Sequence, residues 1–173
     1  MKYLYSLLTV LVIVSGCSRK NEEQLYSEAR EAEQQKNLVL AIERYDEIVT
    51  RFTSTSLAES SQYRVAVLYN SELREMRKAV AAYLKFHDLF PQSKEAAPSL
   101  FMAGFILNNE LHSLDSAKLI YESFLQKYPN HELAGSARFE LESLGKDPSE
   151  FIQSVPPPNE SAKQPSGKAA SDK

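Results

Sequence analysis

The residues able to carry chemistry are few and widely spaced in this sequence. The histidines His87, His112 and His131 stand alone, without the HExxH or CxxC patterns that bring metal ligands together. There is no GxSxG nucleophile motif, and the five glycines are too dispersed to form a phosphate-binding loop. We therefore expect no catalytic residues, no bound metal and no enzymatic activity.

Cys17 is the single cysteine, and it stands two small residues, Ser15 and Gly16, after an apolar run at residues 4–14. That run is shorter than the roughly 20 residues a spanning helix needs, and with Lys2 ahead of it the segment is typical of an export signal. Val14-Ser15-Gly16-Cys17 resembles the bacterial lipobox. The resemblance implies cleavage after Gly16 and a covalent lipid on Cys17. The alternative is an ordinary signal peptide with an incidental cysteine.

Ser18, which follows the cysteine, resembles the sorting signal that directs enterobacterial lipoproteins to the outer membrane. Lipid chains on Cys17 anchor a protein without a spanning helix. Residues 18–20 reach about 10 Å when extended, so we expect the body to lie close to the membrane.

Composition sets the broad class of the protein. Hydrophobic residues make up 43% and charged residues 25% of the 173 residues, as in a globular domain. The net charge of −3 does not favour nucleic acid, because phosphate binding needs an excess of Lys and Arg. We interpret the acidic residues of segment 22–33, Glu33 among them, as a solvated face.

A repeat of 38 residues is the strongest internal signal in the chain. Within each unit an alanine, an aromatic residue, an apolar residue and a second aromatic residue follow at helical offsets that place them on one face. A second set of positions with the same period precedes them, so each unit predicts two amphipathic helices. The repeated positions are Ala41, Ala79, Ala117; Tyr45, Tyr83, Tyr121; Ile48, Phe86, Phe124; Phe52, Phe90, Tyr128; Ala58, Ala96, Ala134; and Tyr63, Phe101, Phe139.

These positions resemble the tetratricopeptide repeat, which has an alanine in its second helix and a closing proline. Pro91 and Pro129 supply the proline in two units, whereas the first unit has Thr53 there. The unit is longer than the family's roughly 34 residues. This longer form, in LFPQSKEAAPSLFMAG and KYPNHELAGSARFELESLG, is similar over residues 24–146 to the periplasmic repeat proteins of the BamD and YbgF (CpoB) types.

The predicted fold class is all-α, an α-solenoid of about three tetratricopeptide-like helix pairs plus a capping helix. A capping box is expected at Ser56, a last short turn at Asp147, and a lid over the final apolar face around Phe139 and Leu141. The predicted helices are 21–36, 38–52, 56–72, 75–90, 94–109, 113–128 and 132–145. The predicted domains are a signal peptide at 1–16, a lipidated tether at 17–20, the helical domain at 21–152 and a disordered Pro-rich tail at 153–173.

In the family, the concave surface of such a stack holds a segment of a partner protein. Carried over to the matching positions, the resemblance implies a groove with basic and apolar side chains, suited to a peptide with apolar anchors. The groove candidates are Tyr26, Arg30, Arg64, Leu68, Met102, Ile106 and Asn109.

The resemblance implies a lipid-anchored scaffold on the periplasmic face of the outer membrane, with another envelope protein as partner; the inner membrane or another cell membrane is the alternative location. Outer-membrane protein assembly, as in the BamD type, is the favoured process. Cell-wall or Tol–Pal work, as in the YbgF type, and pilus or secretion assembly remain alternatives, and a small-molecule-binding lipoprotein is the rival class.

Overall fold

The structure, a computed structural model, describes residues 19–146. Every regular element in this range is a helix, which confirms the all-α prediction. Each predicted helix lies within two residues of an observed one at both ends, counting η1 with α3. The signal peptide, Cys17, the turn at Asp147 and the tail at 153–173 lie outside the described residues.

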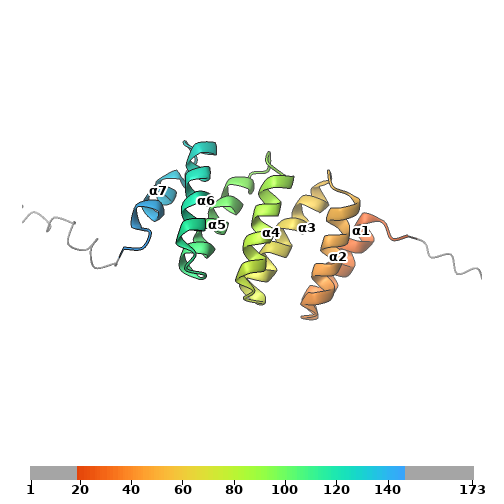
Figure 1. The fold of residues 1–173 in the computed structure, drawn as a ribbon. Coiled ribbons are helices and arrows are strands. Elements are labelled where there is room, and N and C mark those ends of the chain that lie inside the picture. Colours follow the sequence, from red (N-terminus) through yellow and green to blue (C-terminus); the bar gives the residue numbers. More distant parts are fainter. Residues whose placement is uncertain (1–18, 147–173) are drawn as a thin grey trace, which may run out of the picture. The chain divides into compact units, whose positions relative to one another are not determined.

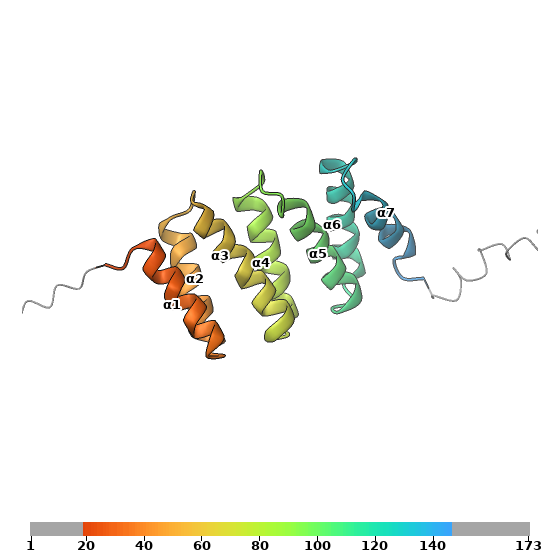
Figure 2. The same cartoon turned by 180° about the vertical axis from the view of Figure 1, so that it is seen from behind.

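The chain divides into two compact units, Met1–Ser99 and Leu100–Lys173, with the division inside α5. Figures 1 and 2 show the helices from opposite sides. The first unit contains α1 (Glu22–Gln34), α2 (Leu38–Arg51), α3 (Ser56–Val67), the π-helical turn η1 (Leu68–Glu72), α4 (Met76–Leu89) and the first turn of α5 (Ala96–Asn109). The second contains the rest of α5, α6 (Leu114–Lys127) and α7 (Ala134–Ser143).

In the first unit α1 packs on α2, α2 on α3 and α3 on α4, and α1 also contacts α3. Fully buried alanines such as Ala29, Ala41 and Ala58 let the helices approach closely. The ring of Tyr63 in α3 packs edge-on against the rings of Tyr83 and Phe86 in α4, at centroid distances of 6.3 and 5.3 Å. The aromatic positions that recur in the sequence therefore form the contact between helices.

The second unit repeats this contact 38 residues later. Phe101 in α5 lies 5.8 Å from Tyr121 and 6.0 Å from Phe124 in α6, measured between ring centroids. α7 packs on α6 and buries Ala134 and Ala137. Phe139, expected in the lid over the last apolar face, is 58% exposed.

The starts of the helices differ in one place from the sequence pattern. Thr55, not Ser56, is the N-cap of α3: its hydroxyl accepts a hydrogen bond from the Ala58 amide at 3.1 Å, and Ser56 is the first helical residue. The predicted capping box at Ser56 is therefore wrong, because the cap lies one residue earlier and the third helical residue, Ala58, has no side-chain acceptor to complete a box. A complete capping box starts α1, where Asn21 and Gln24 bond each other's backbone amides.

The turns inside the three helix pairs share a left-handed residue. Lys36, Arg74 and His112 have φ values of +59°, +55° and +49°, and they are again 38 residues apart. At the first turn the Asn37 amide donates to the Ala32 carbonyl at 2.8 Å, which is the bond of a Schellman C-cap. The period thus extends to backbone conformation, without glycine at these positions.

Candidate partner-binding surface

An ion pair joins α1 to α3 on the surface where the groove was predicted. The Arg64 guanidinium donates to Glu33 through two nitrogens: Nε lies 2.9 Å from Oε2, and Nη2 bonds Oε1. The Tyr45 hydroxyl, from α2, donates to Oε2 of the same carboxylate at 3.1 Å. The Glu33 side chain is only 15% exposed and that of Arg64 is 36% exposed. One carboxylate therefore links three successive helices.

The electrostatics of this cluster keep Glu33 ionised. The hydrogen bonds from the Arg64 guanidinium lower the pKa of Glu33, and the charge of Arg30 adds to the effect. The same carboxylate raises the pKa of Arg64. Burial raises the pKa of the Tyr45 hydroxyl, and the neighbouring carboxylate raises it further. At neutral pH the cluster is a fixed charge pair with a neutral tyrosine.

Three of the predicted groove residues surround this carboxylate. Arg64 bonds it directly, and the half-buried Tyr26 packs its ring edge-on against Tyr45 at 5.8 Å. Arg30, on the next turn of α1, is exposed. We call Tyr26, Arg30, Glu33 and Arg64 the helix-A surface of the first unit, because they lie on α1 and α3, the first helices (helix A) of their pairs. Binding of a partner there stays a prediction.

Two predicted groove residues are wrong as surface anchors. Leu68 is 0% exposed and Ile106 is 1% exposed, so neither offers side-chain area to a partner. They occupy the same position of the 38-residue unit. A step of four residues from Arg64 or Met102 turns about 40° around the helix, and at this point it turns into the core.

The other two groove candidates belong to the second unit. Met102 is half-buried, and Asn109 is exposed, with its side-chain amide donating to the Phe105 carbonyl at 3.1 Å. The second unit has its own polar contact: Asn108 Nδ2 donates to Glu140 Oε2 at 3.0 Å. Burial and the Glu140 carboxylate raise the pKa of Tyr121. Glu140 occupies the position of Arg64 two units later, but Tyr121 meets a carboxylate of the following helix, whereas the Tyr45 hydroxyl bonds Glu33 of the preceding helix.

The sequence interpretation missed Glu33, which it assigned to a solvated acidic face. Its partner Arg64 is 31 residues away, so no local pattern pairs them. One signal was available: a tyrosine in a core position needs a partner for its hydroxyl, and Glu33 precedes Tyr45 by 12 residues on the neighbouring helix.

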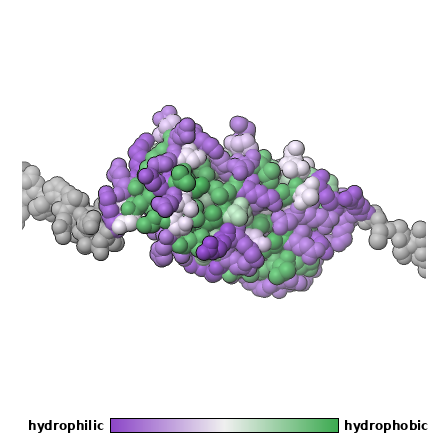
Figure 3. Space-filling view, viewed as in Figure 1, coloured by the Kyte–Doolittle hydropathy of each residue, from purple (hydrophilic) through white to green (hydrophobic). Residues whose placement is uncertain are grey.

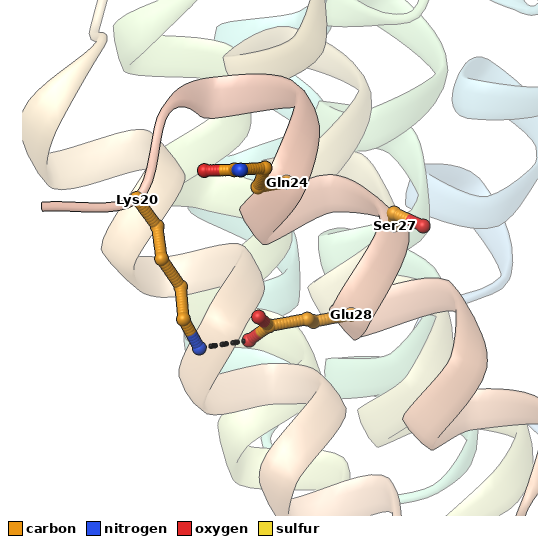
Figure 4. Close-up of a pocket in the computed structure, with 4 residues that line it drawn as sticks. All are labelled: Lys20, Gln24, Ser27 and Glu28. Atoms are coloured by element: carbon orange, nitrogen blue, oxygen red, sulfur yellow. Dashed lines mark hydrogen bonds and ion pairs between the residues drawn. The ribbon is translucent and has the colours of Figure 1, made fainter. Parts of the chain in front are cut away.

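The structure also contains two shallow hollows in the first unit. One of about 300 Å³ lies at the start of α1, lined by Lys20, Gln24, Ser27 and Glu28, with an ion pair across it (Figure 4). The other, of about 220 Å³, lies among α2, α3 and α4 and is lined by Asp46, Gln62, Val65, Tyr69, Lys78, Ala81, Ala82 and Lys85. Within residues 19–146 no group of three His, Cys, Asp or Glu side chains is placed to hold a metal ion.

The face that Figure 3 shows carries hydrophilic and hydrophobic side chains, with an apolar area over α6. Leu114 and Leu119 of that helix are 40% and 66% exposed. Over the range that the structure describes, no helix has the length and apolarity to cross a membrane.

Known proteins place the chain in a family. Residues 18–147 match the family model described as YfiO, an outer membrane lipoprotein. The outer membrane protein assembly factor BamD of Neisseria meningitidis serogroup B is 29% identical over 139 residues, covering 70% of this chain and 52% of that protein. The BamD of Neisseria gonorrhoeae matches with the same identity and coverage. The chain thus spans about half the length of these relatives. Because the family model covers most of the chain, the protein belongs to the YfiO family of outer membrane lipoproteins.

Proposed function

We propose that the protein is a non-catalytic scaffold of outer-membrane protein assembly, held at the periplasmic face of the outer membrane by a lipid on Cys17. The observation that carries the proposal is membership of an outer membrane lipoprotein family, together with relatives named as assembly factors. The lipobox-like segment that ends at Cys17 supports the lipid anchor.

The helix-A surface of the first unit is the proposed site for the partner. Glu33 and Arg64 are held by their mutual bonds, so this surface presents a fixed arrangement that loses little entropy on binding. Arg30 is exposed beside them, and the Tyr26 ring adds apolar area. Such a surface suits a peptide or helix of another envelope protein that carries a carboxylate next to an apolar side chain.

Photo-crosslinking in living cells tests the site and the process together. A photoreactive residue replaces Arg30 on the helix-A surface, and a matched variant carries it at Glu43, an exposed position on α2. We expect position 30 to capture a component of outer-membrane protein assembly and position 43 to give no such product. Equal capture at both positions would contradict the proposal that the helix-A surface is the partner site. Capture of cell-wall or Tol–Pal proteins at position 30 would contradict the proposed role in outer-membrane protein assembly.

The anchor is tested separately by metabolic labelling with an alkyne fatty acid. The wild-type protein is expected to take up label and to fractionate with membranes. The Cys17→Ser variant should lose both properties, because the thiol that receives the lipid is gone. Label on the Cys17→Ser variant, or an unlabelled wild-type protein, would overturn the anchor.

A further inference from the structure

The chain that leads to Cys17 is fastened to the helical body at Lys20. The Arg51 guanidinium, at the end of α2, donates through Nη2 to the Lys20 carbonyl at 2.6 Å. The Lys20 ammonium donates to Glu28 Oε2 at 2.6 Å, across the hollow in Figure 4. Both the backbone and the side chain of Lys20 are therefore bonded to the first unit.

The groups that hold Lys20 are themselves held. Arg51 Nη1 lies 2.5 Å from Glu47 Oε1, and the Arg51 guanidinium lies 4.9 Å from the centroid of the Phe52 ring. The Arg51 side chain is 17% exposed, which distinguishes it from a mobile surface arginine. Glu28 also accepts a bond from Arg44 Nε at 3.2 Å. We call these contacts of Lys20 with Arg51 and Glu28 the clamp.

The clamp lies at one end of the first unit. The Thr55 hydroxyl, at the start of α3, bonds the Glu22 carboxylate at the start of α1. The start of α1, the end of α2 and the α2–α3 turn at residues 52–55 therefore lie together, as both ribbon views show (Figures 1 and 2). The turn between α1 and α2 lies at the other end of the 13-residue α1, about 20 Å away.

We propose that the clamped end, residues 19–22 and 51–55, rests on the headgroup layer of the bilayer that carries the Cys17 lipid. Only Ser18 and Arg19 separate Cys17 from Lys20, so the clamp lies within about 10 Å of the lipid attachment. A longer or unfastened tether lets the body tumble, whereas this one sets which end faces the membrane. The inference rests on the lipid anchor of the proposed function.

The chemistry of the clamped end points to phospholipid headgroups, without a demand for net negative charge. Arg19, Lys20 and Arg51 are opposed by four nearby carboxylates, those of Glu22, Glu23, Glu28 and Glu47. The exposed side chains of the turn, Thr53 and Ser54, are uncharged hydrogen-bonding groups. A zwitterionic lipid surface offers hydrogen-bond partners to these groups. Because the contact does not depend on net charge, we expect the orientation to persist at high salt.

Fluorescence quenching on vesicles tests the orientation. The lipidated full-length protein, with one added cysteine labelled by a fluorophore, is bound to phosphatidylcholine vesicles that contain a headgroup spin label. Ser54→Cys places the fluorophore at the clamped end, and Gln35→Cys places it at the opposite end of α1; both positions are exposed. We expect quenching at least about twofold stronger at position 54, because the two sites differ in height by about 20 Å.

The Arg51→Ala variant tests the clamp itself. Without the guanidinium the Lys20 carbonyl loses its bond, and the exposed Lys20–Glu28 ion pair that remains contributes little. The ratio of quenching at positions 54 and 35 should therefore fall toward one, while circular dichroism shows that the helices remain. Equal quenching at both positions in the lipidated wild-type protein would overturn the orientation. A quenching ratio in Arg51→Ala as high as in the wild-type protein would overturn the role of the clamp. A missing acyl group on Cys17, seen by mass spectrometry, would overturn the anchor itself and separates the two failures.

Discussion

At the scale of single residues, Glu33 shows how a distant partner changes an acidic side chain. Replacing it by glutamine removes the charge that Arg64 and the Tyr45 hydroxyl share, so we expect Glu33→Gln to lower the free energy of unfolding by about 1–3 kcal/mol at pH 7. Urea denaturation measures this. Glu31→Gln is the matched control, because Glu31 is exposed on the same helix and bonds only the neighbouring Gln35 side chain.

The lowered pKa of Glu33 also predicts a pH dependence. A carboxyl group with a lower pKa in the folded state stabilises the fold above its unfolded pKa, near 4.5, and loses that contribution as the pH falls through the folded pKa. The stability difference between wild type and Glu33→Gln should therefore shrink below pH 4.5. A constant difference down to the folded pKa and beyond would contradict this link.

Two glycines make a second comparison at this scale. A Cβ on Gly104 would lie 2.9 Å from Cε1 of the fully buried Tyr121 ring, whereas a Cβ on Gly135 meets no atom within 4 Å. Gly104→Ala should destabilise the protein by about 1–3 kcal/mol through overpacking. Gly135→Ala should stabilise it by up to about 1 kcal/mol, because alanine favours the helix. Thermal unfolding checks both signs, and equal effects would refute the packing argument.

At the scale of elements, Thr55 and Ser56 have different roles at the start of α3. The Thr55 hydroxyl caps the helix, so Thr55→Ala should lower the stability by about 1 kcal/mol, and its bond to Glu22 is lost as well. Ser56 is already helical and exposed, so Ser56→Ala should be neutral or slightly stabilising. Denaturant titration of the two variants shows which residue caps α3. A larger loss of stability in Ser56→Ala than in Thr55→Ala would support Ser56 as the cap, as the sequence predicted.

The helices were predictable because their buried positions recur in a pattern that chain geometry determines. Alanines and aromatics at offsets of three and four residues mark a buried face, and 38 residues later the same contacts return. The groove was only partly predictable. A side chain at the edge of a buried face, such as Leu68, turns inward or outward according to neighbours on other helices, and Glu33 depends on an arginine in another helix pair.

At the scale of the whole molecule, the division into two compact units inside α5 predicts unequal local stability. Contacts in a repeat protein are made mainly with sequence neighbours, so destabilisation spreads only partly. In Gly104→Ala we expect hydrogen exchange to rise more in α6 and α7 than in α1 and α2. Peptide-resolved mass spectrometry measures it, with Gly135→Ala as the control. A uniform rise would show that the described helices open as one unit.

The position shared by Arg64, Met102 and Glu140 has a consequence for how such proteins diversify. The 38-residue period puts this site at the same place on each first helix, yet it carries a phenol ring at Tyr26 and then a cation, a thioether and an anion in turn. A single substitution at such a site therefore changes the charge that a repeat presents at its surface, while the aromatic contacts between the helices of each pair are made by other positions.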